Sequence, residues 1–543
     1  MTYEEYSKIN PRKSTKQPDH IMLSICGDAK HEMCVTWRTS RDIETGYMLI
    51  SEADKDEFRR VDAVNKEVKT DIDVNMNHWA KPKNLSPGTK YKYTVGNDEY
   101  RSGEYTFTTE KENVTKFKFL FFTDQQREDP YLCPDYSVQQ ELLKDAFSRH
   151  PDIDFILTGG DNTNNGENEL QWNGMFSGLE GYIESIPFMM TVGNHDSRGY
   201  ADYFGEDVKK YYAEKAFLFD AQFAESYPKN GPDGLIGENY SFDYGNAHFT
   251  VVSVNYQDKL GDWLYNDVKN SDKTWKIGSY HFPIYPVMPE GVNDDSYPWL
   301  RKGIEEGRFD VLFAGHEHSF ARTYPMTDKG MFEKPSEGVV HFIAGNGGRN
   351  IFNTNCRKIW HPKFYPQEVR QYLYMICEID GDKLTITSYL EDGRTIDYFV
   401  LDKGNDSIFP PEPAPVFNQT KMSFKGIIPE LAAREQPCEQ KDGVFFCAFG
   451  SLARANGGVV VKDGKKMSID FYGHKAELIE GTDIANTPDG QVKLEHEVYR
   501  GSKNQLYISV PDCEKLFGVH HQYYEYNNLI NFDYDAEKAY IDF

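Results

Sequence analysis

The segment Phe309-Asp-Val-Leu-Phe-Ala-Gly-His316-Glu-His318 places a short apolar run directly before two histidines. Four earlier segments have the same form, in which an apolar run ends abruptly in Asp, Asn or His. These segments are Phe117–Asp124, Phe155–Asp161, Phe188–His195 and Trp275–His281. Apolar runs of roughly four to eight residues bounded by glycine are typical of buried strands. The sequence therefore predicts five strands inside a layered α/β arrangement.

The polar residues at the ends of these runs indicate a shared site. In open α/β sheets, ligands bind in the crevice outside the carboxyl ends of the strands. Five strand ends of this kind bring carboxylate, amide and imidazole groups toward one point. Such a mixture of oxygen and nitrogen donors suits divalent metals of the Zn, Mn or Fe type. The pattern predicts an enzyme with a metal site.

The length, the net charge and the distribution of apolar residues limit which classes of partner are expected. The chain has 543 residues and a formal net charge of −26. That length is too great for one core and predicts several domains. The negative charge argues against a nucleic acid as the main partner, since binding a polyanion needs a basic surface. A small phosphorylated substrate is still compatible with this negative charge, because a bound metal ion dominates the electrostatic field near it. No stretch approaches the roughly 20 apolar residues of a membrane span, so no membrane is expected.

The beginning of the chain bears on its location. Residues 1–17 form a polar leader without the apolar core of a signal peptide. If Met1 is the native start, we expect a cytoplasmic protein. The alternative is a secreted protein from which the leader was removed.

The eight cysteines are too few for a disulfide scaffold in a chain of this length. Cys26 and Cys34 flank one predicted hairpin turn, and Cys438 and Cys447 flank another. Each pair is either a pair of free thiols or, in an oxidising compartment, a disulfide bond. Because no Cys-x-x-Cys motif occurs, a thiolate zinc site is not expected.

The composition divides the chain into five parts. The polar leader is followed by a β-sandwich over 18–112, and 115–404 mixes the apolar runs with helical patterns. Within 115–404, the spacing predicts helices over 137–149 and 261–270. Residues 405–416 form a proline-rich linker, and 417–543 is a β-rich domain of unknown role.

Taken one at a time, the polar motifs are weak. Gly160-Asp161 is compatible with a simple turn, and His316 with His318 is compatible with a hydrogen-bonded pair in a loop. In combination they are far more specific, because they occur in one order along successive strand ends. The combination is Asp124-Gln-Gln126, Gly160-Asp161, Gly193-Asn-His-Asp196, Tyr280-His281 and Gly315-His-Glu-His318.

This combination resembles the signature of the calcineurin-like metallophosphoesterase superfamily, and most of all its purple acid phosphatase-like branch. In that branch a fibronectin-type sandwich precedes the catalytic domain, with phrases similar to Val35–Trp37, Leu85–Tyr91 and Tyr105–Thr109. The resemblance covers about residues 18–404 and does not extend to the part beyond the linker.

The resemblance implies both a fold and an activity. The fold is a four-layer α/β/β/α sandwich, with a fibronectin III-like N-terminal β-sandwich and a C-terminal β-rich domain beside it. The activity is that of a metal-dependent phosphoesterase with two divalent ions (Fe, Mn or Zn), in which a metal-bound hydroxide attacks the phosphate ester. Phosphomonoesters are favoured. The alternatives are a phosphodiesterase on the same site or a degenerate core acting as a binding protein. The oligomeric state is left open.

The resemblance also implies roles for individual residues. Asp161 is the bridging carboxylate between two metals. Asp124 and His318 complete one metal, and the other is completed by Asn194, His281 and His316. His195 faces the substrate as the catalytic residue, and Asn194 also borders the substrate.

Two positions depart from the family pattern. Asn164 stands where purple acid phosphatases carry the tyrosine that gives them their colour, so a colourless protein is expected and selectivity for Fe(III) is in doubt. Gln126 stands where many relatives have histidine or glycine. Its amide oxygen either fills a coordination position or hydrogen-bonds a bound water.

Arg322 and His248 lie outside the motifs. Arg322 either clamps a substrate phosphate or pairs with a surface carboxylate, and the second role is favoured. His248 lies inside a predicted strand, where packing or hydrogen bonding is favoured over metal ligation.

Overall fold

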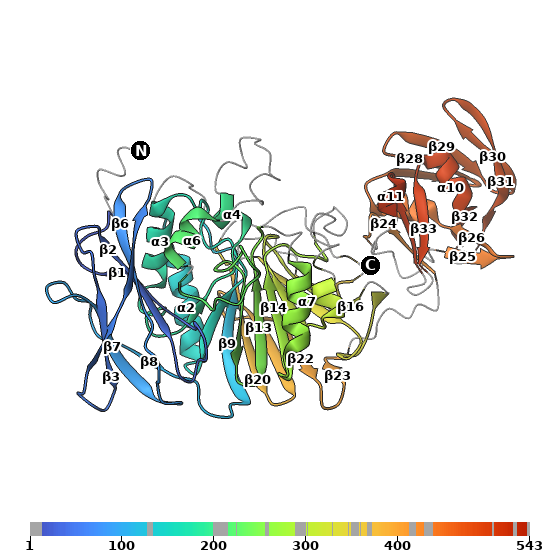
Figure 1. The fold of residues 1–543 in the computed structure, drawn as a ribbon. Helices are drawn as coiled ribbons and strands as arrows, with labels where there is room; N and C mark the ends of the chain where they lie inside the picture. Colours follow the sequence, from blue (N-terminus) through green and yellow to red (C-terminus); the bar gives the residue numbers. More distant parts are fainter. Residues whose placement is uncertain are drawn as a thin grey trace.

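The computed structural model shows three parts that follow one another along the molecule (Figure 1). The structure describes residues 13–127, 134–198, 216–223, 225–255, 260–287, 300, 302–327, 330–345, 347–348, 358, 360–365, 372–411, 420–427, 438–501, 504–524 and 529–539. Residues 1–12 of the polar leader and 412–416 of the proline-rich linker therefore lie outside the described residues.

The N-terminal part is a β-sandwich of two four-stranded antiparallel sheets. Alternating apolar residues such as Val35 and Trp37 turn inward and are fully buried between the sheets. One sheet consists of β1 Asp19–Ser24, β2 Cys34–Ser40, β6 Val74–Ala80 and β5 Val64–Lys69. The other consists of β4 Arg59–Asp62, β3 Tyr47–Glu52, β7 Lys90–Gly96 and β8 Tyr105–Thr108.

The central part contains two mixed sheets. The first runs in the order β11 Phe188–Met189, β10 Phe155–Thr158, β9 Lys116–Phe122, β20 Leu373–Asp380, β21 Lys383–Leu390, β22 Thr395–Asp402 and β23 Ser407–Phe409. The second runs in the order β12 Tyr240–Tyr244, β13 Ala247–Val252, β14 Trp275–Tyr280, β15 Val311–Ala314, β18 Val339–Ala344, β16 Phe320–Thr327 and β17 Gly330–Met331, with β19 Lys363–Tyr365 pairing β16.

Phenylalanine rings join the two sheets face to face. Phe121 of the first sheet stacks on Phe313 of the second with ring centroids 4.6 Å apart. Phe119 meets Phe249 edge to face at 5.2 Å. This all-apolar interior explains why the predicted strands carry apolar residues at consecutive positions rather than in alternation.

Helices cover the outer faces of both sheets. The helix α2 (Ser137–Arg149) packs on β20, and α7 (Gly261–Asn270) packs on β13. The predicted helices over 137–149 and 261–270 are thus present, and the prediction of a four-layer α/β/β/α sandwich is confirmed. The remaining helical segments of this part are α3 Glu169–Leu179, α4 Asn194–Arg198, α6 Phe217–Phe223 and the π-helical turn η3 Lys302–Glu306.

The C-terminal part is β-rich, as expected from its composition. Its elements are β24 Lys421–Phe424, β25 Cys438–Lys441, β26 Val444–Cys447, α9 Phe449–Ala455, β27 Val459–Asp463, β28 Lys466–Phe471, β29 His474–Ile479, β30 Thr482–Thr487, β31 Gly490–Arg500, β32 Leu506–Ser509, α10 Val510–Phe517, β33 His520–Tyr524, β34 Leu529–Asp533 and α11 Ala536–Ala539. Across the described part of the chain, no helix has the length and apolar content that a membrane crossing requires.

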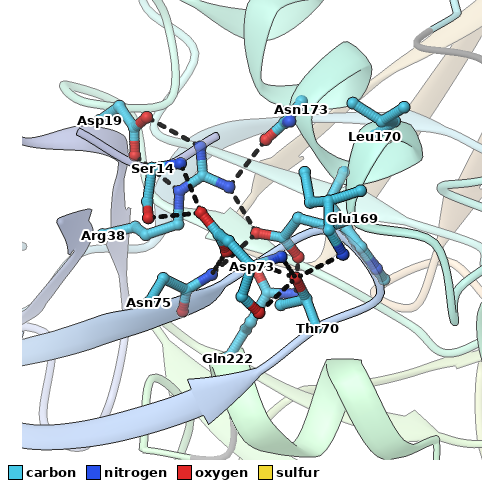
Figure 2. Close-up of polar contacts among 12 residues, drawn as sticks. Ser14, Asp19, Arg38, Thr70, Asp73, Asn75, Glu169, Leu170, Asn173 and Gln222 are labelled. Carbon is cyan, nitrogen blue, oxygen red and sulfur yellow. Dashed lines mark hydrogen bonds and ion pairs between the residues drawn. The ribbon is translucent and has the colours of Figure 1, made fainter. Parts of the chain in front are cut away.

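A buried polar network joins the N-terminal sandwich to the central part (Figure 2). Arg38 of β2 forms an ion pair with Glu169, the first residue of α3, and donates to Asn173 Oδ1 at 2.8 Å. Both charged side chains are almost completely buried, with 2% and 0% of their surface exposed. The backbone N–H of Glu169 donates to Asp71 Oδ1 at 2.9 Å. The sandwich therefore holds the N-terminus of α3 in place.

The substitution Arg38→Met should lower the free energy of unfolding by about 3–5 kcal/mol, because it leaves Glu169 buried without its cation. Arg41→Met is the matched control, since Arg41 pairs with Glu67 at 3.1 Å while both side chains are more than half exposed. The control should lose no more than about 1 kcal/mol. Urea unfolding curves measure both changes, and equally small losses would contradict the role of the network.

His248 of β13 gives the fold a pH dependence. Its imidazole contacts Asp243 Oδ1 at 2.7 Å and Asp267 Oδ2 at 2.9 Å. Burial alone would lower the pKa of His248, but these two carboxylates raise it from 6.5 to about 9. The protonated histidine therefore stabilises the fold below pH 6.5, and this contribution is lost as the pH rises through about 9.

We expect His248→Gln to flatten the pH dependence of stability between pH 6.5 and 9, the window that the pKa shift of His248 defines. Thermal midpoints of the wild type and the variant, measured across that window, test the expectation. A difference between the two proteins that stays constant with pH would show that His248 does not carry the effect.

Candidate metal centre

Backbone hydrogen bonds join four of the five predicted strand ends in two pairs. The N–H of Asp124, after β9, donates to the carbonyl of Gly160, after β10, at 3.0 Å. The N–H of Gly315, after β15, donates to the carbonyl of His281, after β14, at 2.9 Å. The two sheets are linked in turn, because the His316 N–H donates to Asp124 Oδ1 at 2.9 Å.

Three of these residues adopt an uncommon backbone conformation. Asp124, Asp161 and His316 have positive φ values of 54°, 50° and 67°. This left-handed region is rarely occupied by residues other than glycine, and each case costs on the order of 1–3 kcal/mol. The turns aim the side chains back over the strand ends, and strain of this kind is concentrated at functional sites.

Glycines beside these residues allow a close approach of the segments. A Cβ atom on Gly193 would lie 2.2 Å from Asp161 Oδ1, and one on Gly315 would lie 2.3 Å from Asp124 Oδ2. Any larger residue would push the carboxylates out of place. Steric crowding thus explains why the Gly-Asn-His and Gly-His-x-His motifs begin with glycine.

Asp161, His281 and His316 form a cluster of potential ligands, whose ligand atoms all lie within 4.8 Å of one another. His281 Nδ1 donates to the carbonyl of Gly159 at 2.9 Å, since a carbonyl only accepts. Its Nε2 therefore points into the cluster, 3.2 Å from Asp161 Oδ2. Histidines that bind metals commonly donate their other ring N–H to a backbone carbonyl in this way.

The remaining predicted ligands also form close contacts with one another. Asn194 Oδ1 lies 2.9 Å from His281 Nε2 and 3.0 Å from His316 Nδ1. His318 Nε2 lies 3.4 Å from Asp124 Oδ1. The structure therefore brings all six predicted ligands together in two adjoining groups.

His195 lies beside this cluster with one ring nitrogen fixed. Its Nδ1 donates to the carbonyl of Asn164 at 3.0 Å, and its Nε2 lies 4.0 Å from Asp161 Oδ2. The Asn164 N–H in turn donates to Gln171 Oε1 at 3.2 Å. Because Gln171 belongs to α3, the helix that Arg38 anchors also orients His195.

Gln126 makes a contact that neither of its two expected roles included. Its Nε2 donates to Asp161 Oδ2 at 3.0 Å. Its Oε1 is buried and accepts no hydrogen bond from any described residue. A buried acceptor of this kind next to a carboxylate suits a cation or its water, so the donor set fits the divalent ions that the sequence predicts.

The electrostatics of the cluster favour positive charge. Burial alone would raise the pKa of Asp161, but His281 and His195 hold it well below its usual range. Burial alone would lower the pKa of His281, but Asp161 raises it to about 9. A fully buried carboxylate thus requires a proton or a cation beside it.

Asp196 organises the loops that carry the cluster, a role that the motif alone did not reveal. Although it is only 1% exposed, its carboxylate accepts hydrogen bonds that span 2.9–3.1 Å. The donors are Asn162 N, Asn162 Nδ2, Thr163 N, Thr163 Oγ1 and Gly193 N. The loops of Asp161 and Asn194 are thus fastened to one carboxylate. The signal in the sequence from which this role could have been predicted is the acidic residue directly after Gly-Asn-His.

Arg322 lies away from the candidate centre. It is 1% exposed and pairs with Asp397 at 2.7 Å. Its guanidinium also lies 4.0 Å from the centre of the Phe399 ring. The favoured pairing with a carboxylate is present, but this pair is buried rather than at the surface.

Two family models match the chain. The model described as "Calcineurin-like phosphoesterase" matches residues 117–320. The model described as "Purple acid Phosphatase, N-terminal domain" matches residues 18–109. The first match contains all six predicted ligands and His195.

The chain is also similar to curated proteins of Arabidopsis thaliana. It is 22% identical over 384 residues to "Probable inactive purple acid phosphatase 1", covering 60% of this chain and 57% of the relative. It is 25% identical over 343 residues to "Purple acid phosphatase 21", covering 61% of this chain and 71% of the relative. The chain thus spans less than two thirds of the length of the first of these relatives.

A solved structure of similar fold is purple acid phosphatase PPD1 from seeds of yellow lupin (Lupinus luteus). It aligns with a TM-score of 0.57 and 16% identity over 71% of this chain and 74% of that chain. A second, the structure of PhoD, aligns with a TM-score of 0.52 and 15% identity over 71% of this chain and 91% of that chain. At these identities, the alignments establish the fold alone.

The substitution Asp196→Asn should weaken metal binding by roughly 10–100-fold. The amide NH₂ group would replace a carboxylate oxygen that accepts at least two hydrogen bonds, and it cannot accept them. Titration of metal-free protein with Zn²⁺ or Mn²⁺ measures the affinity. The exposed Asp233→Asn is the control with the same change in charge. Equal affinities of Asp196→Asn and the wild type would mean that the hydrogen bonds do not position the ligands.

Proposed function

Because this chain joins a calcineurin-like phosphoesterase domain to a domain of the purple acid phosphatase N-terminal type, we propose that it hydrolyses phosphate esters with the help of two divalent metal ions. The observation that carries the proposal is the convergence of Asp161, His281 and His316, whose ligand atoms lie within 4.8 Å of one another.

The division of the ligands follows their contacts. Asp161 would bridge the two ions, as the resemblance to calcineurin-like phosphoesterases implies. Asn194, His281 and His316, which contact one another, would hold one ion. Asp124 and His318, which also form a close pair, would hold the other. Gln126, through its N–H contact to Asp161, fixes the orientation of the bridging carboxylate.

The bound ions would polarise the phosphoryl oxygens and lower the pKa of a coordinated water. The protein contributes position and proton transfer. His195 presents Nε2 toward the site because its Nδ1 is committed to the Asn164 carbonyl. When it carries a proton at Nε2, it is placed to donate that proton to the departing oxygen of the ester.

Phosphomonoesters are the favoured substrates. The N-terminal family model is named for purple acid phosphatases, and relatives such as "Purple acid phosphatase 21" are named phosphatases, which supports a monoester over a diester. A phosphodiesterase activity on the same residues is the alternative within this class. Asn164, in place of the tyrosine that binds ferric iron, supports Mn²⁺, Zn²⁺ or Fe²⁺ over Fe³⁺.

A binding protein with a degenerate phosphoesterase core is the second candidate function. It is favoured by the relatives whose names include "probable inactive", together with the changed positions Gln126 and Asn164. The complete set of six ligands and His195 weighs against it. The two functions differ in metal content, since a degenerate core holds no stoichiometric metal.

We expect metal-free protein to hydrolyse a chromogenic aryl phosphate only after Mn²⁺, Zn²⁺ or Fe²⁺ is added. Asp161→Asn and His281→Ala should each lower kcat at least 100-fold and reduce the bound metal. Loss of the bridging carboxylate or of an imidazole ligand removes charge stabilisation worth several kcal/mol in the transition state. Initial rates and elemental analysis of the same samples measure both effects.

His248→Gln is the matched control, because it removes a buried imidazole from the strand beside β14 without touching the candidate centre. It should keep the turnover and metal content of the wild type well below its thermal midpoint. A wild type that holds no stoichiometric metal and turns over neither mono- nor diesters would favour a binding role. Full metal-dependent turnover in Asp161→Asn would refute the site assignment.

A further inference from the structure

The core of the C-terminal domain contains three cysteine residues close together. Cys438 lies in β25, Cys447 ends β26, and Cys513 lies in α10. None of the three is more than 2% exposed. They belong to the apolar cluster that holds this domain together.

Cys447 lies between the other two. Its Sγ atom is 3.3 Å from the Sγ atom of Cys513, although the two residues are 66 positions apart in sequence. Cys438 is the direct cross-strand partner of Cys447 in the antiparallel pair of β25 and β26. The sulfur of Cys447 thus contacts the helix, whereas the sequence offered only the hairpin residue Cys438 as a possible disulfide partner.

A metal site does not explain the group. In the part of the chain that the structure describes, Asp161, His281 and His316 form the one group of three potential ligand atoms that lie within 4.8 Å of one another. The three cysteines therefore do not offer a common point to an ion. Two sulfur atoms in contact instead need to approach by only about 1.2 Å to reach covalent distance.

We propose that Cys447 and Cys513 form a disulfide bond that closes the C-terminal domain. A small disulfide such as glutathione disulfide serves as the oxidant. The thiolate of Cys447 attacks one of its sulfurs and releases one glutathione thiol. The thiolate of Cys513 then attacks the Cys447 sulfur of the mixed disulfide and releases the second. Two protein thiols are oxidised, glutathione disulfide is reduced to two thiols, and the two protons pass to them.

Burial determines when this bond forms. Burial raises the pKa of Cys513 and of Cys438 well above the ordinary value for a thiol. In the folded domain little of Cys513 is therefore in the thiolate form, which is the reactive form. The bond forms while the domain is folding, and once formed it is shielded from reductants.

The bond has consequences for stability and location. It joins β26 to α10 and encloses the chain from β27 to β32, which restricts the unfolded state. Disulfides of this kind persist in oxidising compartments and are rare in the cytosol. A disulfide here therefore agrees with the alternative in which the protein is secreted. The proposal does not depend on the proposed catalysis.

The test uses the full chain, unfolded in urea and refolded in buffers with excess glutathione disulfide or excess reduced glutathione. Remaining thiols are alkylated, and the protein is digested and mapped by mass spectrometry without reduction. We expect a cross-linked peptide pair containing Cys447 and Cys513 after oxidative refolding, and a higher thermal midpoint for the C-terminal transition. Alkylation of both cysteines after oxidative refolding, or a Cys438–Cys447 bond in their place, would overturn the proposal.

Two variants sharpen the result. Cys438→Ser should keep the cross-link and its stabilising effect. Cys513→Ser should lose both, so that its thermal midpoint no longer depends on the redox buffer. If Cys513→Ser fails to fold, the peptide map of the wild type and of Cys438→Ser still decides the question. A redox-dependent midpoint that persists in folded Cys513→Ser would contradict the assignment.

Discussion

The buried carboxylate of Asp161 is the constraint on which the centre of this molecule depends. With 1% of its surface exposed, it has no access to the water that would stabilise its charge. The surrounding groups respond to that charge: the N–H of His195 and the Nε2 group of Gln126 donate to it at 2.9 and 3.0 Å. The imidazole rings of His281 and His195 also lie beside it, with Nε2 atoms 3.2 and 4.0 Å from Oδ2. A buried anion of this kind persists only where protons or cations balance it.

Two layers of support hold that carboxylate in place. Asp196 fastens the loops after β10 and β11, and its many hydrogen bonds leave these loops little freedom. Farther out, Arg38 of the N-terminal sandwich fixes the start of α3, and α3 reaches the loop of Asn164 through Gln171. The N-terminal domain is thus connected to His195 by an unbroken series of contacts. This connection gives the sandwich a structural role in the site, although it contributes no candidate ligand.

The local sequence was sufficient to predict the strands and the order of the candidate ligands along the chain. Apolar runs before Asp124, Asp161 and His281 predict β9, β10 and β14, because buried strands need apolar residues on both faces. The family resemblance implied two sheets, but the local sequence did not assign each strand to one of them, since strand pairing depends on distant partners. It also overestimated β11, which contains only Phe188–Met189 before the chain turns toward α4. The hydrogen bonds of Asp196 and Gln126, and the contact of Cys447 with Cys513, join segments far apart in sequence and needed the structure.

In the proposed centre, strand ends from two sheets hold two cations that Asp161 bridges. Anomalous X-ray diffraction from crystals grown with Mn²⁺ or Zn²⁺ tests it most directly. We expect two anomalous peaks about 3.5–4 Å apart, one beside His281 and His316 and the other beside His318. An anomalous map without a peak at Asp161, from crystals in which the same ion is present in excess, would contradict it.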